Sequence, residues 1–189
     1  MEPLFAIFSA FGLSASAGLN AYIPLLVIGV VAHYTDLIEL ASPYDTLANP
    51  WILIMLGLLL IVEMLADKIP AVNHLNDLVQ TFVRPVAGAI AFAAGTNVIQ
   101  GINPVVALAC GLLVAGGVHV AKSVAVRPLV TVSTAGAGNT PVSVAEDVAS
   151  TAVSVASVLM PVLVAVLVGL LLLVLLWWWA RPAPDAGPA

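Results

Sequence analysis

The sequence predicts an all-α integral membrane protein, a helical bundle of about five transmembrane helices plus one interfacial amphipathic helix. Hydrophobic residues make up 62% of the 189 residues and charged residues only 8%, whereas soluble domains carry about 25% charged residues. The mean hydropathy is +1.15. The apolar residues also gather into long runs, and about 20 apolar residues suffice to cross a bilayer as a helix. Together these observations exclude a soluble globular domain.

Several apolar runs are expected to form the transmembrane helices. The first is predicted to be a helix rather than a cleaved signal peptide, because no Lys or Arg precedes it. In the last, Pro161 is expected to kink the helix, and the Ser- and Thr-rich half before it is expected to face protein or water. We therefore predict one transmembrane domain over residues 1–179 and a disordered, Pro-rich tail over 180–189. The runs cover residues 3–32, 51–66, 85–98, 104–126 and 144–179.

One polar stretch, "DKIPAVNHLNDLVQTFVRP" (67–85), interrupts this apolar pattern. Between residues 71 and 83 its apolar residues recur at helical spacing on one face, while Asn, His, Asp, Gln and Thr fill the other. The pattern predicts the amphipathic helix, lying on the cytoplasmic interface between the second and third spans. Pro85 is expected to begin the next helix, since proline favours the first helical turn.

The basic residues predict an orientation, because four of the five fall in or beside the second and fourth loops. The positive-inside rule then places those loops and the N-terminus in the cytoplasm and the C-terminus outside. Tyr34, Trp51 and Trp177 would lie at the outer interface, as aromatic belts do. The expected location is a bacterial inner (plasma) membrane. With no basic stripe, nucleic acid is not an expected partner; membrane lipids and further copies of the chain are.

The ionisable residues of the helices form a candidate site. Glu63 and Asp67 are four residues apart and His119 and Lys122 three apart, so each pair shares a helix face. Charges inside a bilayer are costly unless paired or wet, so we expect the two faces to meet toward the cytoplasmic side. Two interpretations stay open: a structural ion-pair network, or an inward-facing substrate-binding site. The candidate residues are Glu63, Asp67, Lys68, Arg84, His119, Lys122, Arg127, Glu146 and Asp147.

A second polar feature lies inside the first run, in "GLSASAGLNAYIP" (12–24). Small residues at this density let helices approach closely. Asn20 is expected near mid-membrane, where it must find a hydrogen-bond partner. Pro24 frees a backbone carbonyl nearby, as in the broken helices of transporters.

The same stretch suggests an internal repeat. Two of its glycines and its asparagine are matched, at a constant shift, by Gly111, Gly117 and His119 in the fourth run. The first and fourth runs are expected to cross the membrane in opposite directions. The sequence therefore suggests an inverted-topology repeat.

Enzyme and metal chemistry are not indicated. His33, His74 and His119 fall in different elements without an HExxH motif or a Cys partner, so neither a metal site nor a cofactor is expected. There is no GxSxG motif, and intramembrane catalysis by Glu63, Asp67 or His119 is the lesser alternative. We expect a small transporter or channel with a cytoplasm-facing polar site for a small or anionic solute or a lipid headgroup. The alternative is a non-catalytic membrane subunit or scaffold.

Four stretches resemble a known membrane family. They are "GLNAYIPLL" (18–26), "DKIPAVNHLNDLVQTFVRPVAGA" (67–89), "HVAKSVAVRP" (119–128) and "GNTPVSVAED" (138–147). Through them the chain resembles the uncharacterised family called domain of unknown function 4126, over most of residues 10–150. The resemblance implies a multi-pass membrane fold and no particular activity.

Overall fold

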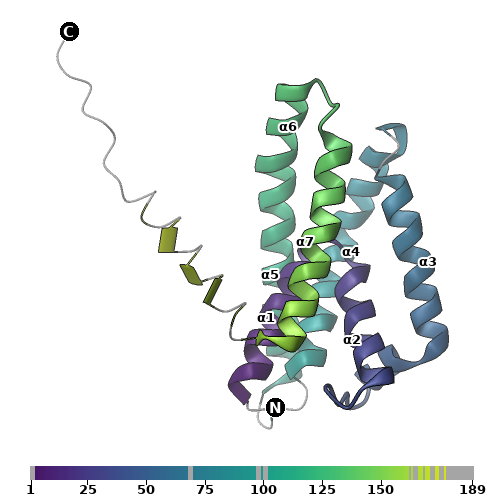
Figure 1. Ribbon diagram of the computed structural model, residues 1–189, viewed down its shortest axis with the longest axis vertical. Coiled ribbons are helices and arrows are strands. Elements are labelled where there is room, and N and C mark those ends of the chain that lie inside the picture. The colour runs from purple at the N-terminus through teal and green to yellow at the C-terminus, as the bar shows by residue number, and fades with distance from the viewer. Residues whose placement is uncertain are drawn as a thin grey trace.

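The computed structural model describes residues 3–67, 70–96, 99, 102–161 and single positions between 163 and 177, with only the backbone given for 70–75 and 77. Within these residues the chain is helical, without strands. Lys68 and the predicted tail lie outside the described residues. Figure 1 shows the helices side by side in a bundle. They are α1 (Pro3–Leu19), α2 (Tyr22–Tyr34), η1 (Tyr44–Ala48), α3 (Pro50–Ala66), α4 (Pro70–Thr96), α5 (Pro104–Ala121), η2 (Lys122–Val126), α6 (Arg127–Thr134) and α7 (Asn139–Leu159).

Two helices begin at the same local signal, an Asn-Pro pair. The side chains of Asn49 and Asn103 accept the backbone N–H groups of Trp51 and Val105, and proline follows at the first helical position. Asparagine is a strong N-cap, and proline loses nothing there because that N–H has no partner within the helix. These caps fix where α3 and α5 start.

The prediction of a single first span over residues 3–32 is wrong, because α1 and α2 form a helical hairpin. Asn20 ends α1, and its side-chain oxygen accepts the N–H groups of Tyr22 and Ile23, which starts a new helix in the reverse direction. Ala6 and Ser9, early in α1, line a cavity together with residues 36–40, which follow α2. The N-terminus and the segment after α2 therefore lie at the same end of the bundle (Figure 1).

The hairpin also changes the predicted topology. The sequence placed the N-terminus and residues 33–50 on opposite sides, but α2 returns the chain to the end at which α1 starts. The inverted repeat is likewise not supported. Ser14 donates a hydrogen bond to the Gly111 carbonyl, and Gly18 lies against Ala115, four residues further along in both helices. Helices α1 and α5 therefore run parallel, whereas inversion requires opposite directions.

The boundary predicted at Pro85 does not exist. The predicted amphipathic helix (71–83) and third span (85–98) are one continuous helix, α4, with Pro85 inside it. An interior proline removes one hydrogen bond and tends to kink a helix, but here the packing of α4 on α1 and α5 holds the helix together. The fourth run also continues past its predicted end at Val126, because the π-helical turn η2 joins α5 to α6.

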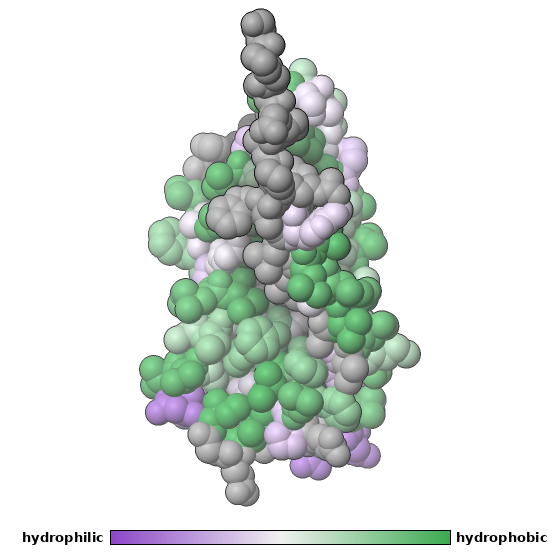
Figure 2. Space-filling model, turned by 90° about the vertical axis from the view of Figure 1, so that its left-hand side faces the viewer, coloured by the Kyte–Doolittle hydropathy of each residue, from purple (hydrophilic) through white to green (hydrophobic). Residues whose placement is uncertain are grey.

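Among the described residues, three helical segments are long and apolar enough to cross a membrane: Leu78–Thr96, Pro104–Thr134 and Asn139–Leu159. Helices α1, α2 and α3 are apolar but shorter. Large apolar side chains such as Trp51, Leu113 and Val132 are mostly exposed, and Figure 2 shows apolar residues covering much of one face, with hydrophilic ones gathered near its lower edge. This surface is that of a membrane-associated protein.

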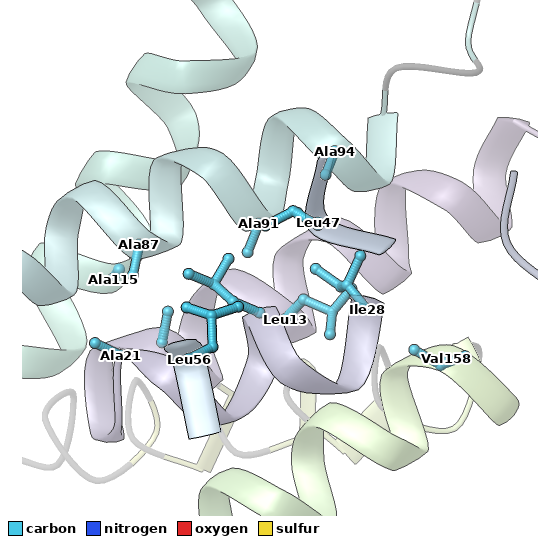
Figure 3. Close-up of a cluster of buried hydrophobic side chains, with 12 residues drawn as sticks. Leu13, Ala21, Ile28, Leu47, Leu56, Ala87, Ala91, Ala94, Ala115 and Val158 are labelled. Atoms are coloured by element: carbon cyan, nitrogen blue, oxygen red, sulfur yellow. The ribbon is translucent and has the colours of Figure 1, made fainter. Parts of the chain in front are cut away.

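The core joins the hairpin to the long helices. Leu13 of α1 and Ile28 of α2 pack against Ala91 of α4, with Leu56 of α3 and Val158 of α7 in the same cluster (Figure 3). Most of the other core residues are alanines. Small residues let helix backbones approach closely, and this packing seats the tip of the hairpin inside the bundle.

Candidate functional site

The candidate site is a charged cluster at the end of the bundle where α3 ends and α7 begins. Five elements supply it, because the last turn of α3, the middle of α4, the end of α5 with η2, the start of α6 and the first turns of α7 all converge there. All its members are buried except Arg127, which is partly exposed. We define the charged cluster as Glu63, Asp67, Arg84, His119, Lys122, Arg127, Glu146 and Asp147.

Arg84 lies at the centre of this cluster and is 1% exposed. Its Nη2 atom donates to Glu63 Oε1 at 2.9 Å and lies 4.0 Å from Asp67 Oδ2. Its Nη1 atom lies 3.4 Å from His119 Nδ1. One guanidinium thus joins α3, α4 and α5, which suits the several donors of a rigid, planar group.

A second set of contacts joins α3 and α6 to α7. Arg127 Nη2 is 3.4 Å from both Asp67 Oδ2 and Glu146 Oε2. Asp67 also accepts hydrogen bonds from Asn76 at 2.6 Å and from Ser143 at 3.0 Å. Both oxygens of the Asp67 carboxylate are therefore satisfied, as a buried anion requires.

Lys122 connects the cluster to the hairpin. Its ammonium is 2.6 Å from Glu146 Oε2 and donates to the Leu19 carbonyl at the end of α1, at 3.1 Å. Lys122 is the first residue of the π-helical turn, and such turns are frequent at functional sites. The extra residue in this turn offsets the helix face of α5 from that of α6, so Lys122 and Arg127 reach the same carboxylate.

The tip of the hairpin, at Asn20, contacts α7. Asn20 is 1% exposed, and its Nδ2 group donates to Asp147 Oδ1 at 2.9 Å. Below it, the Ser16 hydroxyl lies 2.7 Å from Ser150 Oγ and 2.6 Å from Ser154 Oγ. The partner that the sequence required for Asn20 is thus an acidic residue of the cluster.

The match to known families decides where the chain belongs. Its residues 7–181 match the family described as "Domain of unknown function (DUF4126)". The chain is a DUF4126 protein. No curated protein and no solved structure matches it. The matched range contains the hairpin from residue 7 onward and every residue of the charged cluster.

The four stretches that carry the resemblance to the DUF4126 family meet in space. One contributes Asn20, the second Asp67 and Arg84, the third His119, Lys122 and Arg127, and the fourth Glu146 and Asp147. Among the cluster residues, Glu63 alone lies outside these stretches. Segments far apart in the sequence therefore build one site.

Sequence reasoning missed the polar residues that surround the charges. They carry no charge, and the sequence indicated only that the Ser- and Thr-rich start of the last run faces protein or water. On α7 a pattern was available, since Ser143, Asp147, Ser150, Ser154 and Ser157 recur at steps of four and three and are all buried. The other missed residues are Asn76, Gln80 and Thr81.

Unsatisfied polar atoms gather in this DUF4126 site. Among the described residues, buried side-chain atoms without a hydrogen-bond partner include Glu63 Oε2, Gln80 Oε1, Arg84 Nε and Glu146 Oε1. Most buried polar atoms in proteins have a partner, so each exception needs a cause. In the described part of the chain no three His, Cys, Asp or Glu side chains are grouped as metal ligands are.

We expect Asn20→Asp to destabilise this DUF4126 protein by roughly 1–3 kcal/mol, because it removes a buried donor and sets two carboxylates against each other. The acid keeps the oxygens that cap α2. Asn49→Asp is the matched control, since Asn49 is an exposed cap and Asp caps helices equally well. Thermal unfolding in detergent measures both, and equal melting temperatures would contradict the assigned contact with Asp147.

Proposed function

We propose that this chain is a small membrane transport protein whose charged cluster binds a solute or ion and whose helical hairpin controls access to it. One observation carries the proposal: the chain turns back inside the bundle, and the turn between α1 and α2 lies directly on a buried charged cluster. Discontinuous helices whose ends face a polar site are the usual arrangement in secondary transporters. The hairpin supplies both helix ends, since Lys122 binds the last carbonyl of α1 and Asn20 caps α2.

The depth of the cluster supports this function. Glu63 is 2% exposed, while its neighbours Val62 and Leu65 on α3 are 62% and 59% exposed. The charges thus lie at a level where the outer surface is apolar. Ionisable groups at such depth are costly, and apolar residues of similar volume would stabilise a bundle as well or better. A role in binding accounts for charges that stability does not require.

A cavity at the opposite end of the bundle supplies the second half of a transport path. It measures about 270 Å³ and lies between α1, α2, α4 and residues 36–40. Ser9 and Leu13 line it, and the buried serines of α1 and α7 lie between it and the charged cluster. A shift of the hairpin would change which end reaches the site.

We propose that the cluster end faces the cytoplasm of a bacterial inner membrane, on the positive-inside rule. Arg127 is partly exposed there, whereas the opposite end carries the exposed acidic residues Asp36 and Glu39. Because α1 and α2 form a hairpin, the N-terminus then lies outside, not inside. Membrane lipids are the expected surroundings of the apolar surface.

A scaffold remains the second candidate, and the ion pairs favour it. Lys122 and Arg127 both contact Glu146, and Arg127 also contacts Asp67, so much of the charge is compensated internally. A structural network of this kind would hold α3, α6 and α7 together without moving.

Accessibility of Ser150 separates the two functions. Ser150 is fully buried against Ser16, so a scaffold would protect a thiol there. In a transporter the site opens, and we expect Ser150→Cys, in a Cys110→Ser background, to react with a membrane-impermeant maleimide while the protein stays folded. Ser133→Cys is the control, because Ser133 is exposed on α6 and should react only from the cytoplasmic side. Complete protection of Ser150→Cys under conditions that label Ser133→Cys would contradict transport.

A further inference from the structure

Glu63 has an unusual position within the charged cluster. It projects from the last turn of α3 into the bundle and is 2% exposed. Its Oε1 atom accepts a hydrogen bond from Arg84 at 2.9 Å, but its buried Oε2 atom has no hydrogen-bond partner among the described residues. Asp67 differs, because both of its oxygens accept hydrogen bonds. A carboxylate anion with one bare, buried oxygen is strongly disfavoured.

A second acceptor in the same place also lacks a donor. Gln80 is 2% exposed, and in the described part of the chain its Oε1 atom has no hydrogen-bond partner. Gln80 and Arg84 are four residues apart on α4 and so share the face that meets Glu63. Tyr22 of α2 shares a hydrogen bond with Gln80 and also lies near Glu63. Two unsatisfied acceptors on neighbouring side chains are what one bridging proton would satisfy.

The balance of acidic and basic groups in the described cluster is consistent with one additional bound proton. Arginine can only donate, so its contact with His119 Nδ1 requires that nitrogen to accept and therefore to carry no proton. With His119 neutral, the described cluster holds four carboxyl groups against three basic groups. The titratable and charged groups around Glu63, element by element, are Tyr22 on α2, Asp67 at the end of α3, Arg84 on α4, His119 on α5 and Asp147 on α7.

We propose that Glu63 is a proton-binding site. The proton is held on Oε2 and donated to Gln80 Oε1, while Oε1 keeps its bond from Arg84. Protonation turns one of the two bare acceptors into a donor, so both gain a partner at once. Loss of the proton leaves a carboxylate that relies on Arg84 alone. The proposal rests on the proposed function in one respect only, that the proton is the ion that transport would use.

Infrared difference spectroscopy of the purified protein in detergent tests the site without any transport assay. A titration between low and high pH should show the carbonyl stretch of a protonated carboxylic acid at pH values where exposed carboxyl groups are already ionised. Glu63→Gln should remove this band and with it one bound proton per chain. Glu39→Gln is the matched control, since Glu39 is an exposed glutamate at the opposite end, and should leave the band unchanged.

A further variant covers the case in which Glu63→Gln does not fold. Gln80→Leu keeps Glu63 but removes its acceptor, so the carbonyl band should move to the frequency of a carboxyl group without a hydrogen bond. A band that survives Glu63→Gln, or one that ignores Gln80→Leu, would overturn the proposal. Displacement of the band by sodium at constant pH would also overturn it, since the site would then bind a metal cation. Failure of the Ser150→Cys labelling with an intact Glu63 band would refute transport alone.

Discussion

Arg84→Met is expected to be the most destabilising single change in the charged cluster, with a loss of roughly 3–5 kcal/mol in the free energy of unfolding. Arg84 is 1% exposed and contacts Glu63 and Asp67 at the end of α3 and His119 on α5. Its removal leaves the buried Glu63 carboxyl group without the donor to its Oε1 atom and takes a positive charge from beside Asp67, while methionine fills most of the same volume. The melting temperature of the purified protein measures the effect.

Two further variants test whether the lost ion pairs cause that effect. Glu63→Gln in the Arg84→Met background should recover part of the loss, because it removes one carboxylate that Arg84 had paired. Arg127→Met should cost less than Arg84→Met, since Arg127 is partly exposed and its partners Asp67 and Glu146 keep other donors. An Arg84→Met protein that melts like the wild type would show that the ion pairs contribute nothing to the fold.

Gly111→Ala is expected to lower the free energy of unfolding by about 1–3 kcal/mol or more, because the packing of α5 on α4 leaves no space for the added methyl group. A Cβ atom at Gly111 would press on the Gly88 carbonyl oxygen of α4 and come within 2.6 Å of Phe92 Cβ. Backbone atoms of a packed helix cannot move aside as the end of a long side chain can. Helices α4 and α5 would have to separate.

Gly117→Ala, in the same helix, is the control for this prediction. A Cβ atom at Gly117 meets nothing within 4 Å, so the change should raise stability by about 0.5–1 kcal/mol through helix propensity. Thermal unfolding of the two variants side by side gives the comparison. Equal stabilities would mean that the close contact between Gly88 and Gly111 does not exist in the folded protein.

The sequence predicted the helical membrane class because composition depends on no detail of the fold. From their helical spacing it also predicted that the pair Glu63 and Asp67 would meet the pair His119 and Lys122, and these residues do lie in one cluster. The prediction failed for the first apolar run, because hydropathy does not show whether such a run crosses the membrane or turns back. A run of apolar residues long enough to span a membrane looks the same whether it crosses or turns back, and only the capping geometry of Asn20 distinguishes the two.

The prediction was also wrong at one proline, because a proline alone does not show whether a helix begins at it. Pro85 was expected to start a helix and lies inside α4, while Pro50 and Pro104 do start helices. The difference is the preceding residue: Asn49 and Asn103 cap their helices, but Arg84 is engaged with Glu63. The neutral polar residues around the cluster, such as Gln80 and Ser143, could not be assigned to the site either. Their role depends on which residues pack beside them in the fold.

The hairpin at the start of the chain has a consequence for the order of biogenesis. Its polar groups find their partners late in the sequence, since Ser14 bonds to residue 111, Ser16 to residue 150 and Asn20 to residue 147. Proteins are synthesised from the N-terminus, so the hairpin emerges before α5 and α7 and enters the bilayer with these groups unsatisfied. Helices α5 and α7 must follow before the tip can settle. The hairpin is therefore made before the helices that hold its tip in place.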